Sequence, residues 1–120
     1  MPPRSVFAAP FLVAAALTAT SLPAAAVFDC EGTVVGVRPI SQYNHANGNG
    51  FLAVRTGPGG GYAQIGEVYR GDTLSVYGKS GNWYEASCMF GRCQNPLWGP
   101  AYPAGWVHKN YVQVRGYCPR

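Results

Sequence analysis

Charged residues are scarce in this sequence and are not gathered in any one segment. They make up 12% of the 120 residues, and the nine Lys and Arg residues are scattered along the chain. Nucleic-acid-binding domains concentrate basic residues in a patch or a stripe, so this class of function is not expected. The formal net charge of +4 allows only a weak attraction to anionic surfaces.

The sequence also lacks the motifs that mark hydrolases and metalloenzymes. It contains no G-x-S-x-G, no H-E-x-x-H and no paired-carboxylate motif. Cys88, Cys93 and His108 would make an incomplete zinc set, because structural zinc sites usually combine two closely spaced ligand pairs. A cysteine nucleophile with His108 as its base is the remaining catalytic alternative. Disulfide formation explains the cysteines more simply, and we therefore expect no enzyme activity, no metal and no cofactor.

No apolar run is long enough to span a membrane. The longest, residues 6–17, has twelve residues and is broken by Pro10, whereas a spanning helix needs about 20. It follows Arg4 and precedes three alanines at 24–26, which is the order of charge, apolar core and A-x-A site in a secretory signal peptide. The sequence therefore predicts a signal peptide over residues 1–26, cut after the last alanine or one residue earlier. The remaining 94 residues would be secreted or periplasmic, with no membrane span left.

All four cysteines lie in this exported part of the chain. An even number of cysteines in a small exported domain indicates two disulfides, but four cysteines allow three pairings and the sequence alone does not choose among them. Cys88 and Cys93 are near enough in sequence to close a local turn. Cys30 and Cys118 lie near the two ends of the exported chain, and the ends of a compact domain are often close together. We therefore expect the pairs Cys88–Cys93 and Cys30–Cys118.

The exported part has the pattern of an all-β domain and no amphipathic helix. Gly, Pro and Asn interrupt it every few positions, and the short segments between them are rich in β-formers. Residues 73–77 alternate, with Leu74 and Val76 on one face. The expected strands are residues 33–37, 51–55, 73–77, 83–88, 105–108 and 112–114. Short strands in so small a domain favour a barrel of about five strands, because closure hides the strand edges.

Several short motifs, taken together, resemble the bacterial SH3 (SH3b) domains. They are L-A-V-R-T-G-P at residues 52–58 with a Gly-rich loop up to Tyr62, I-G-E-V at 65–68, G-D-T-L-S-V at 71–76, G-N-W-Y at 81–84 and G-W-V at 105–107. Each motif alone is weak, whereas their order and spacing are specific. The resemblance implies an SH3-like barrel.

The resemblance also sets the expected domain boundaries. It covers residues 51–114, about two thirds of the exported chain, and implies an SH3b-like domain over residues 51–115. An N-terminal extension, residues 27–50, would precede this domain, and a tail, residues 116–120, would follow it. Residues 89–103 form an enlarged loop within the domain.

Aromatic residues are the strongest indication of a binding site. They account for 14 of the 94 exported residues, and Phe51, Tyr77 and Tyr84 are expected in the core. Side chains alternate along a strand, so Trp83 is expected to face outward if Tyr84 faces inward. By similarity to the ligand groove of SH3 barrels, the residues that would line a groove are Tyr62, Trp83, Trp106, His108, Asn110 and Tyr111.

The resemblance implies a non-catalytic binding module of the bacterial envelope. The implied ligand class is cell-wall peptide or glycan, held in the aromatic groove by stacking and a few polar groups. The alternative is a protein-interaction or inhibitor-like exported factor. In that case the enlarged loop, residues 89–103, would contact an envelope protein through Trp98 and Tyr102.

Overall fold

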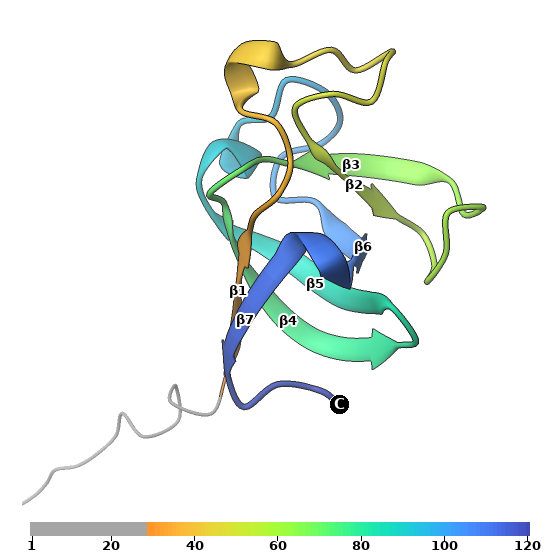
Figure 1. Ribbon diagram of the computed structural model, residues 1–120, viewed down its shortest axis with the longest axis vertical. Helices are drawn as coiled ribbons and strands as arrows, with labels where there is room; N and C mark the ends of the chain where they lie inside the picture. The colour runs from red at the N-terminus through yellow and green to blue at the C-terminus, as the bar shows by residue number, and fades with distance from the viewer. Residues whose placement is uncertain (1–28) are drawn as a thin grey trace, which may run out of the picture.

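Seven antiparallel strands form one strongly curled sheet, in the order β3-β2-β6-β5-β4-β1-β7 (Figure 1). The computed structural model describes residues 29–120, so the predicted signal peptide, residues 1–26, lies outside the described residues. The strands are β1 (Cys30–Val34), β2 (Leu52–Arg55), β3 (Gln64–Val68), β4 (Thr73–Ser80), β5 (Trp83–Phe90), β6 (Ala104–His108) and β7 (Val112–Gly116). Three 3-10 helices join them: η3 (Ile40–Gln42), η4 (Arg92–Gln94) and η5 (Lys109–Tyr111). The predicted all-β, SH3-like class is confirmed, with seven strands in place of about five.

Strand β1 comes from the segment expected to precede the SH3b-like domain and is part of the same sheet. Residues 27–50 were expected to form an extension in front of the domain, but β1 lies inside the sheet between β4 and β7. Cys30 is paired with Val76 on one side and with Gly116 on the other. At Gly32 a side chain would lie 2.6 Å from Val112 Cγ1, so glycine allows β1 to pack closely against β7. The N-terminal segment therefore contributes one strand to the sheet.

Strand β3 was not predicted, because Gly66 interrupts its pattern of β-forming residues. Gly66 pairs with Val54 of β2, next to a shift in the strand register between Val54 and Arg55. A Cβ atom at this position would lie 2.6 Å from Pro103 Cβ. The glycine is thus required by the close approach of the enlarged loop, residues 89–103, and does not end the strand.

The core is formed by side chains that alternate along the strands. Leu74 and Val76 of β4 are buried, as their alternation predicted. Tyr84 packs against this core, and Phe51 is buried. Tyr77, also expected in the core, is 53% exposed, because it lies on the outward-facing side of β4 together with the other odd-numbered residues.

Two disulfides fasten the barrel. One joins Cys30 of β1 to Cys118 in the C-terminal tail, across 88 positions of the sequence. The other joins Cys88 of β5 to Cys93 of η4, five positions apart. These are the pairs expected from the sequence.

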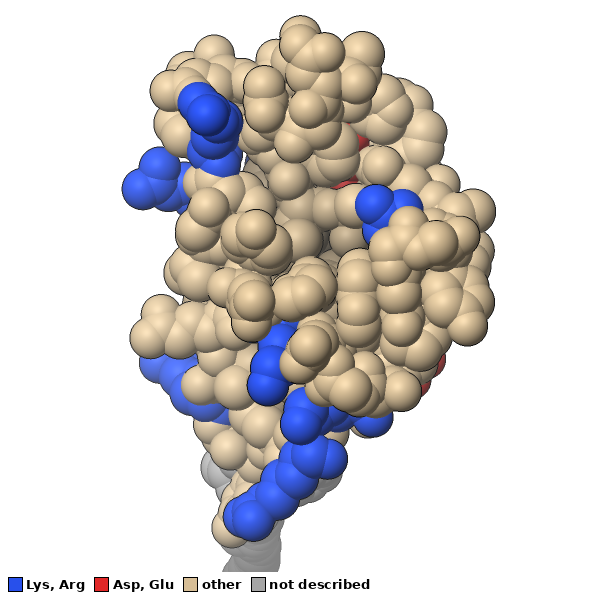
Figure 2. All heavy atoms as spheres, turned by 45° about the vertical axis from the view of Figure 1, so that its right-hand side comes forward, with Lys and Arg blue, Asp and Glu red and all other residues tan. Residues whose placement is uncertain are grey.

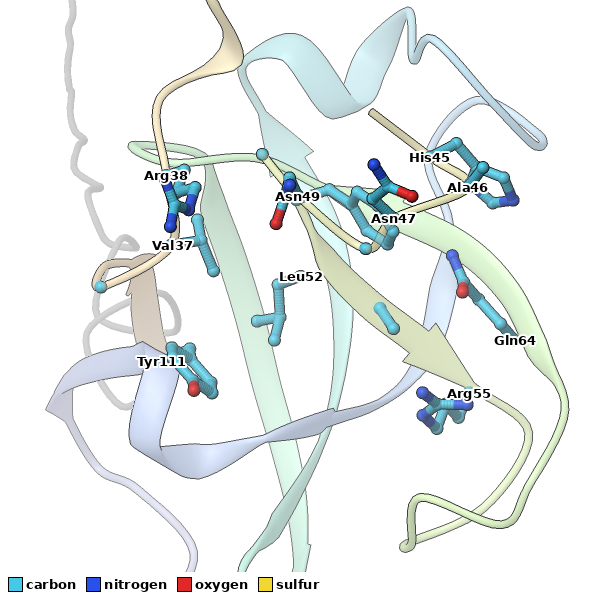
Figure 3. A pocket seen from close by; sticks show the side chains of 15 residues that line it. Val37, Arg38, His45, Ala46, Asn47, Asn49, Leu52, Arg55, Gln64 and Tyr111 are labelled. Carbon is cyan, nitrogen blue, oxygen red and sulfur yellow. The ribbon is translucent and has the colours of Figure 1, made fainter. Parts of the chain in front are cut away.

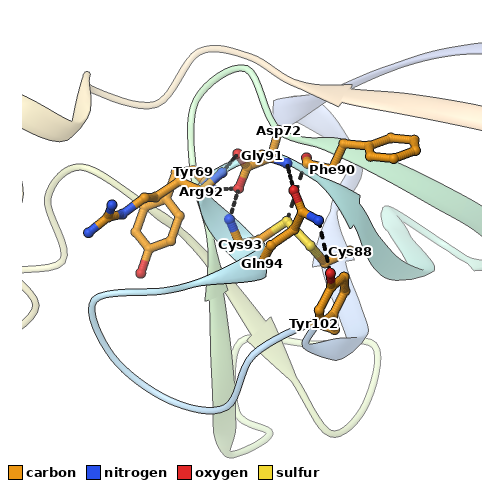
Figure 4. The surroundings of a disulfide bond; sticks show 9 residues. All are labelled: Tyr69, Asp72, Cys88, Phe90, Gly91, Arg92, Cys93, Gln94 and Tyr102. Atoms are coloured by element: carbon orange, nitrogen blue, oxygen red, sulfur yellow. Dashed lines mark hydrogen bonds between the residues drawn. A yellow bond between two sulfur atoms is a disulfide. The ribbon is translucent and has the colours of Figure 1, made fainter.

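The enlarged loop is ordered around a buried aspartate, as Figure 4 shows. Asp72 accepts hydrogen bonds from the backbone N–H groups of Tyr69 (2.7 Å), Arg92 (2.8 Å) and Cys93 (3.0 Å). Burial raises the pKa of the Asp72 carboxyl, and these three donors partly offset that effect. Together with the Cys88–Cys93 disulfide, the aspartate holds the start of the loop against the turn that precedes β4.

Candidate ligand-binding site

Trp83, His108 and Tyr111 form a row of neighbouring aromatic rings at the junction of β5, β6 and η5. Trp83 and His108 are directly paired across β5 and β6, which places their side chains on the same face of the sheet. The ring centroids of Trp83 and His108 lie 5.1 Å apart, and those of His108 and Tyr111 lie 6.0 Å apart, both in edge-to-face geometry. We call these three residues the aromatic row.

Helix η5 holds the row in position. His108 caps this helix, since its Nδ1 accepts a hydrogen bond from the backbone N–H of Asn110 at 3.2 Å. The backbone N–H of Lys109 donates to the carbonyl of Asn82 at 2.8 Å, which ties η5 to the turn between β4 and β5. The Asn110 side chain, predicted to bind ligand, is exposed beside the row.

Trp106 lies on the same outward face as the row. It is paired with Arg55 of β2 on one side and with Glu85 of β5 on the other, so the three side chains share one face. Trp83 and His108 are the next residues on that face of β5 and β6, because side chains on one face recur every second position. The indole of Trp106 is partly buried.

Tyr62 lies apart from the row, in the first Gly-rich loop. Its ring rests on Gly57, where a Cβ atom would lie 2.5 Å from the ring carbons. Its carbonyl accepts a hydrogen bond from Arg55 Nη1 at 3.0 Å. Of the six residues predicted to line a groove, the structure brings Trp83, His108 and Tyr111 into contact, with Asn110 and Trp106 on or beside the same face and Tyr62 next to Arg55.

A separate groove of about 600 Å³ lies beside this face, and sequence analysis did not find it (Figure 3). Leu52 and Ala53 of β2 line it and are called its floor. Residues 36–38 and 45–50 form much of its wall, with Arg55, Gln64 and Tyr111 around the rest. Tyr111 is the one predicted site residue among those that line it.

The groove wall is a short hairpin-like loop. Asn44 and Asn49 exchange two backbone hydrogen bonds of 2.9 and 3.1 Å, and the side chain of Asn44 accepts a third from the N–H of Asn47. Gly48 has a φ of 73°, a conformation that costs glycine little. The run of Asn and Gly predicted a polar loop, but nothing in that run indicates that the loop lies against β2.

A buried carboxylate anchors the same loop. Glu67 of β3 is 0% exposed and accepts hydrogen bonds from His45 Nδ1 at 2.5 Å and from the Tyr69 hydroxyl at 2.7 Å. Burial, with the nearby Glu67 carboxylate, raises the pKa of Tyr43 to about 12. The same two causes raise the pKa of Tyr69 still further above its usual value. We call Tyr43, His45, Glu67 and Tyr69 the Glu67 cluster.

Trp98 of the enlarged loop packs on this cluster. Its ring stacks on the imidazole of His45 at a centroid distance of 4.3 Å, and Phe51 stacks on His45 at 5.6 Å. The backbone N–H of Leu97 donates to the Tyr69 hydroxyl at 2.9 Å. Trp98 was expected to contact a partner. Part of its ring instead packs within the domain, and the side chain is 37% exposed.

Tyr102, the other loop residue expected to contact a partner, is open to solvent. It is 56% exposed, and its hydroxyl accepts a hydrogen bond from Gln94 Nε2 at 2.9 Å. Its φ of 53° is unusual for a residue other than glycine. The loop thus has a packed part around Trp98 and an exposed part around Tyr102.

The surface is more basic than the formal charge indicates. Residues 29–120 contain eight basic and five acidic side chains, but Glu67 and Asp72 are buried and bonded internally. The surface of this part of the chain therefore carries eight basic and three acidic side chains, a net charge of +5. Figure 2 shows basic side chains at several places on one face and almost no acidic atoms.

The described residues contain no free thiol and no cluster of metal-ligating side chains. All four cysteines are in disulfides, so none is a free nucleophile. In residues 29–120, no group of three or more His, Cys, Asp or Glu side chains is arranged to hold a metal ion. Across the same residues, no helix is long and apolar enough to cross a bilayer.

The chain folds as a small β-barrel with two disulfides and with a row of aromatic side chains on one outward face. The family model of the bacterial SH3 domain matches residues 50–113, more than half of the chain. The chain belongs to the bacterial SH3 domain family, whose members are in general binding modules. No curated protein and no solved structure matches this chain.

Proposed function

We propose that this protein is an exported, non-catalytic binding module of the bacterial envelope that binds cell-wall peptide or glycan on its aromatic face. The observation that carries the proposal is the aromatic row. Trp83 and His108 share one face of the sheet, and His108 contacts both Trp83 and Tyr111 of η5, while the core is filled by other residues. Aromatic rings with a polar edge suit a ligand that is partly apolar and partly hydrogen-bonding, as sugars and short peptides are.

The disulfides support the exported location. Two disulfides in a domain of this size persist in the periplasm or outside the cell, where thiols are not kept reduced. The predicted signal peptide, residues 1–26, would direct the chain there. Periplasmic or secreted protein would meet the cell wall directly.

Sedimentation with insoluble peptidoglycan tests the proposal. Replacing Trp83 by alanine is expected to weaken binding about 30-fold, because aromatic anchors at the centre of a binding face can contribute 2 kcal/mol or more. Tyr77→Ala is the matched control, since Tyr77 is an exposed aromatic residue of β4 outside the row. A melting curve for each variant verifies that the domain is folded.

Two results would contradict the proposal. If the unchanged protein stays in the supernatant, it does not bind the wall. If Trp83→Ala and Tyr77→Ala sediment equally well, the aromatic row is not the binding face.

The second candidate function is binding of an envelope protein through the enlarged loop. The observation that favours it is the exposure of Phe90, Leu97 and Tyr102 in and beside that loop. A pull-down from envelope extract, compared with a pull-down on purified peptidoglycan, separates the two functions. Under the second function, Tyr102→Ala would abolish capture of one defined protein and would leave peptidoglycan sedimentation unchanged.

A further inference from the structure

About half of the residues that line the groove beside the aromatic row lie outside the family match. Its wall at residues 36–38 and 45–49 precedes residue 50, where the match to the bacterial SH3 domain begins. The floor, Leu52 and Ala53, belongs to the matched part. The volume, about 600 Å³, lies within the range of pockets that bind small ligands. The groove is therefore formed jointly by the matched domain and the segment that precedes it.

The groove carries positive charge that nothing in it neutralises. Arg38 and Arg55 lie at opposite ends, with Leu52 between them (Figure 3). Arg38 Nη1 donates to Gln42 Oε1 at 3.0 Å, and Arg55 Nη1 donates to the Tyr62 carbonyl at 3.0 Å. Both partners are neutral, and neither arginine forms a salt bridge within residues 29–120. The two guanidinium groups are thus oriented but keep their charge.

The remaining lining suits a peptide. No Asp or Glu is among the residues that line the groove. Asn47, Asn49 and Gln64 supply side-chain amides, which can both donate to and accept from peptide groups. The floor between them is apolar. A short extended chain that carries carboxylates would match the two arginines, the amides and the floor.

The groove and the aromatic row share one residue. Tyr111 lines the groove and is also the last ring of the row, 6.0 Å from His108. A ligand that lies on the row can therefore continue into the groove without leaving the protein surface. Such a ligand would have one part that stacks on aromatic rings and another part that carries carboxylates.

The groove wall is held in place before any ligand binds. His45 lines the groove, donates to the buried Glu67, and is stacked between Phe51 and Trp98. A wall anchored in this way loses little conformational freedom on binding, which favours affinity.

We propose that this groove is a second ligand subsite, which binds the carboxylate-bearing peptide arm of a cell-wall fragment between Arg38 and Arg55. The inference rests on the proposed function, because it assigns the sugar part of the same ligand to the aromatic row. Arginine binds carboxylate through paired, charge-assisted hydrogen bonds. No acidic side chain lines the groove, so the charges of Arg38 and Arg55 are available to a ligand.

The test uses two soluble probes and the disulfide-bonded protein. The first probe is a muropeptide, a wall disaccharide with its peptide, and the second is the same molecule with its carboxylates converted to primary amides. Calorimetry gives each affinity, and backbone amide shifts in NMR spectra locate each probe. We expect the amidated probe to bind at least about tenfold more weakly, because one hydrogen bond to a charged group contributes roughly that factor. Shifts are expected at residues 36–38 and 46–53.

Matched variants distinguish binding by the groove from attraction by positive charge elsewhere on the surface. Arg38→Gln and Arg55→Gln should each weaken binding of the free muropeptide about tenfold and should reduce the difference between the two probes. Lys79→Gln, which removes a positive charge on β4 outside the groove, should change the affinity less than about twofold. A melting curve confirms that each variant folds. The amidated probe tests recognition of the carboxylates on the unchanged protein.

The failures of the inference and of the proposed function differ. Equal affinity for the two probes, or shifts confined to the aromatic row, overturns the inference and leaves wall binding standing. A second pair of results also overturns the inference alone. The protein then does not bind the soluble muropeptide, and Arg38→Gln and Arg55→Gln leave its sedimentation with whole peptidoglycan unchanged. Absence of both muropeptide binding and sedimentation overturns the proposed function and the inference together.

Discussion

Replacing Glu67 by alanine should be the most damaging single change at the groove wall. The carboxylate is fully buried and accepts hydrogen bonds from His45 and Tyr69. Its removal leaves both donors without their acceptor in the interior. Leaving a buried hydrogen-bonding group without its partner typically costs about 1–3 kcal/mol for each group. Domains of this size have total stabilities of about 5–15 kcal/mol, so the loss should be easy to measure.

Glu67→Gln separates the role of shape from the role of charge. The amide has nearly the shape of the carboxylate, and its oxygen can still accept from the Tyr69 hydroxyl. Its N–H group can donate to His45 Nδ1 when the imidazole takes its other tautomer. Only the charge assistance is lost, so the free energy of unfolding should fall by about 1–2 kcal/mol.

Urea unfolding followed by tryptophan fluorescence measures both effects. Glu31→Gln is the control, because its partner Arg115 is highly exposed and such a surface pair is worth less than about 1 kcal/mol. The expected order of stability is unchanged protein, Glu31→Gln, Glu67→Gln and then Glu67→Ala. A Glu67→Ala variant as stable as the Glu31→Gln control would refute the claim that the buried carboxylate joins the groove wall to the barrel.

Three further predictions concern the disulfides, the core and the Glu67 cluster. In the chain-entropy model, Cys30→Ser should cost about 4–5 kcal/mol and Cys88→Ser about 2, because the two loops span 88 and five positions. Equal losses in a urea titration of the two variants would speak against this model. Tyr84→Ala should cost about 3 kcal/mol or more, since its ring packs on the core, and a near-normal melting temperature would contradict that placement. Tyr43 should ionise near pH 12 and Tyr69 at a still higher pH, because both pKa values are raised above 10.0 in the folded protein. Their contribution to stability is therefore complete below pH 10.0 and is lost as the pH rises through each raised pKa. The tyrosinate absorbance of the folded protein measures this, and normal titration of all tyrosines would exclude a buried cluster.

The parts of the fold that were predictable depend on local pattern. Alternation identified Leu74 and Val76 as core residues, because strand geometry places every second side chain on one face. The same alternation places Tyr77 outside, and its aromatic character alone wrongly suggested the core. The disulfide pairs followed from the five-residue spacing of Cys88 and Cys93 and from the tendency of chain ends to meet.

Within the candidate site, the sequence indicated individual residues but not their grouping. Trp83 and His108 were expected near each other by resemblance, and the pairing of β5 with β6 brings them together. Tyr62 was assigned to the same groove, but its ring rests on Gly57 in the first loop. Which aromatic residues meet depends on strand register, and register is not visible in the spacing of single residues.

The sequence by itself determined the class of structure, the family and the oxidised state of the cysteines, because each depends on composition, short motifs or spacing. Only the tertiary structure decided that β1 lies inside the sheet and that the loops at residues 36–50 and 89–103 meet over β3. The contact of His45 with Trp98 joins residues 53 positions apart, and His45 donates a hydrogen bond to the buried carboxylate of Glu67. Nothing around Glu67 in the sequence distinguishes it from a surface acid. Its burial results from the packing of three distant segments, and that packing also creates the wall of the groove.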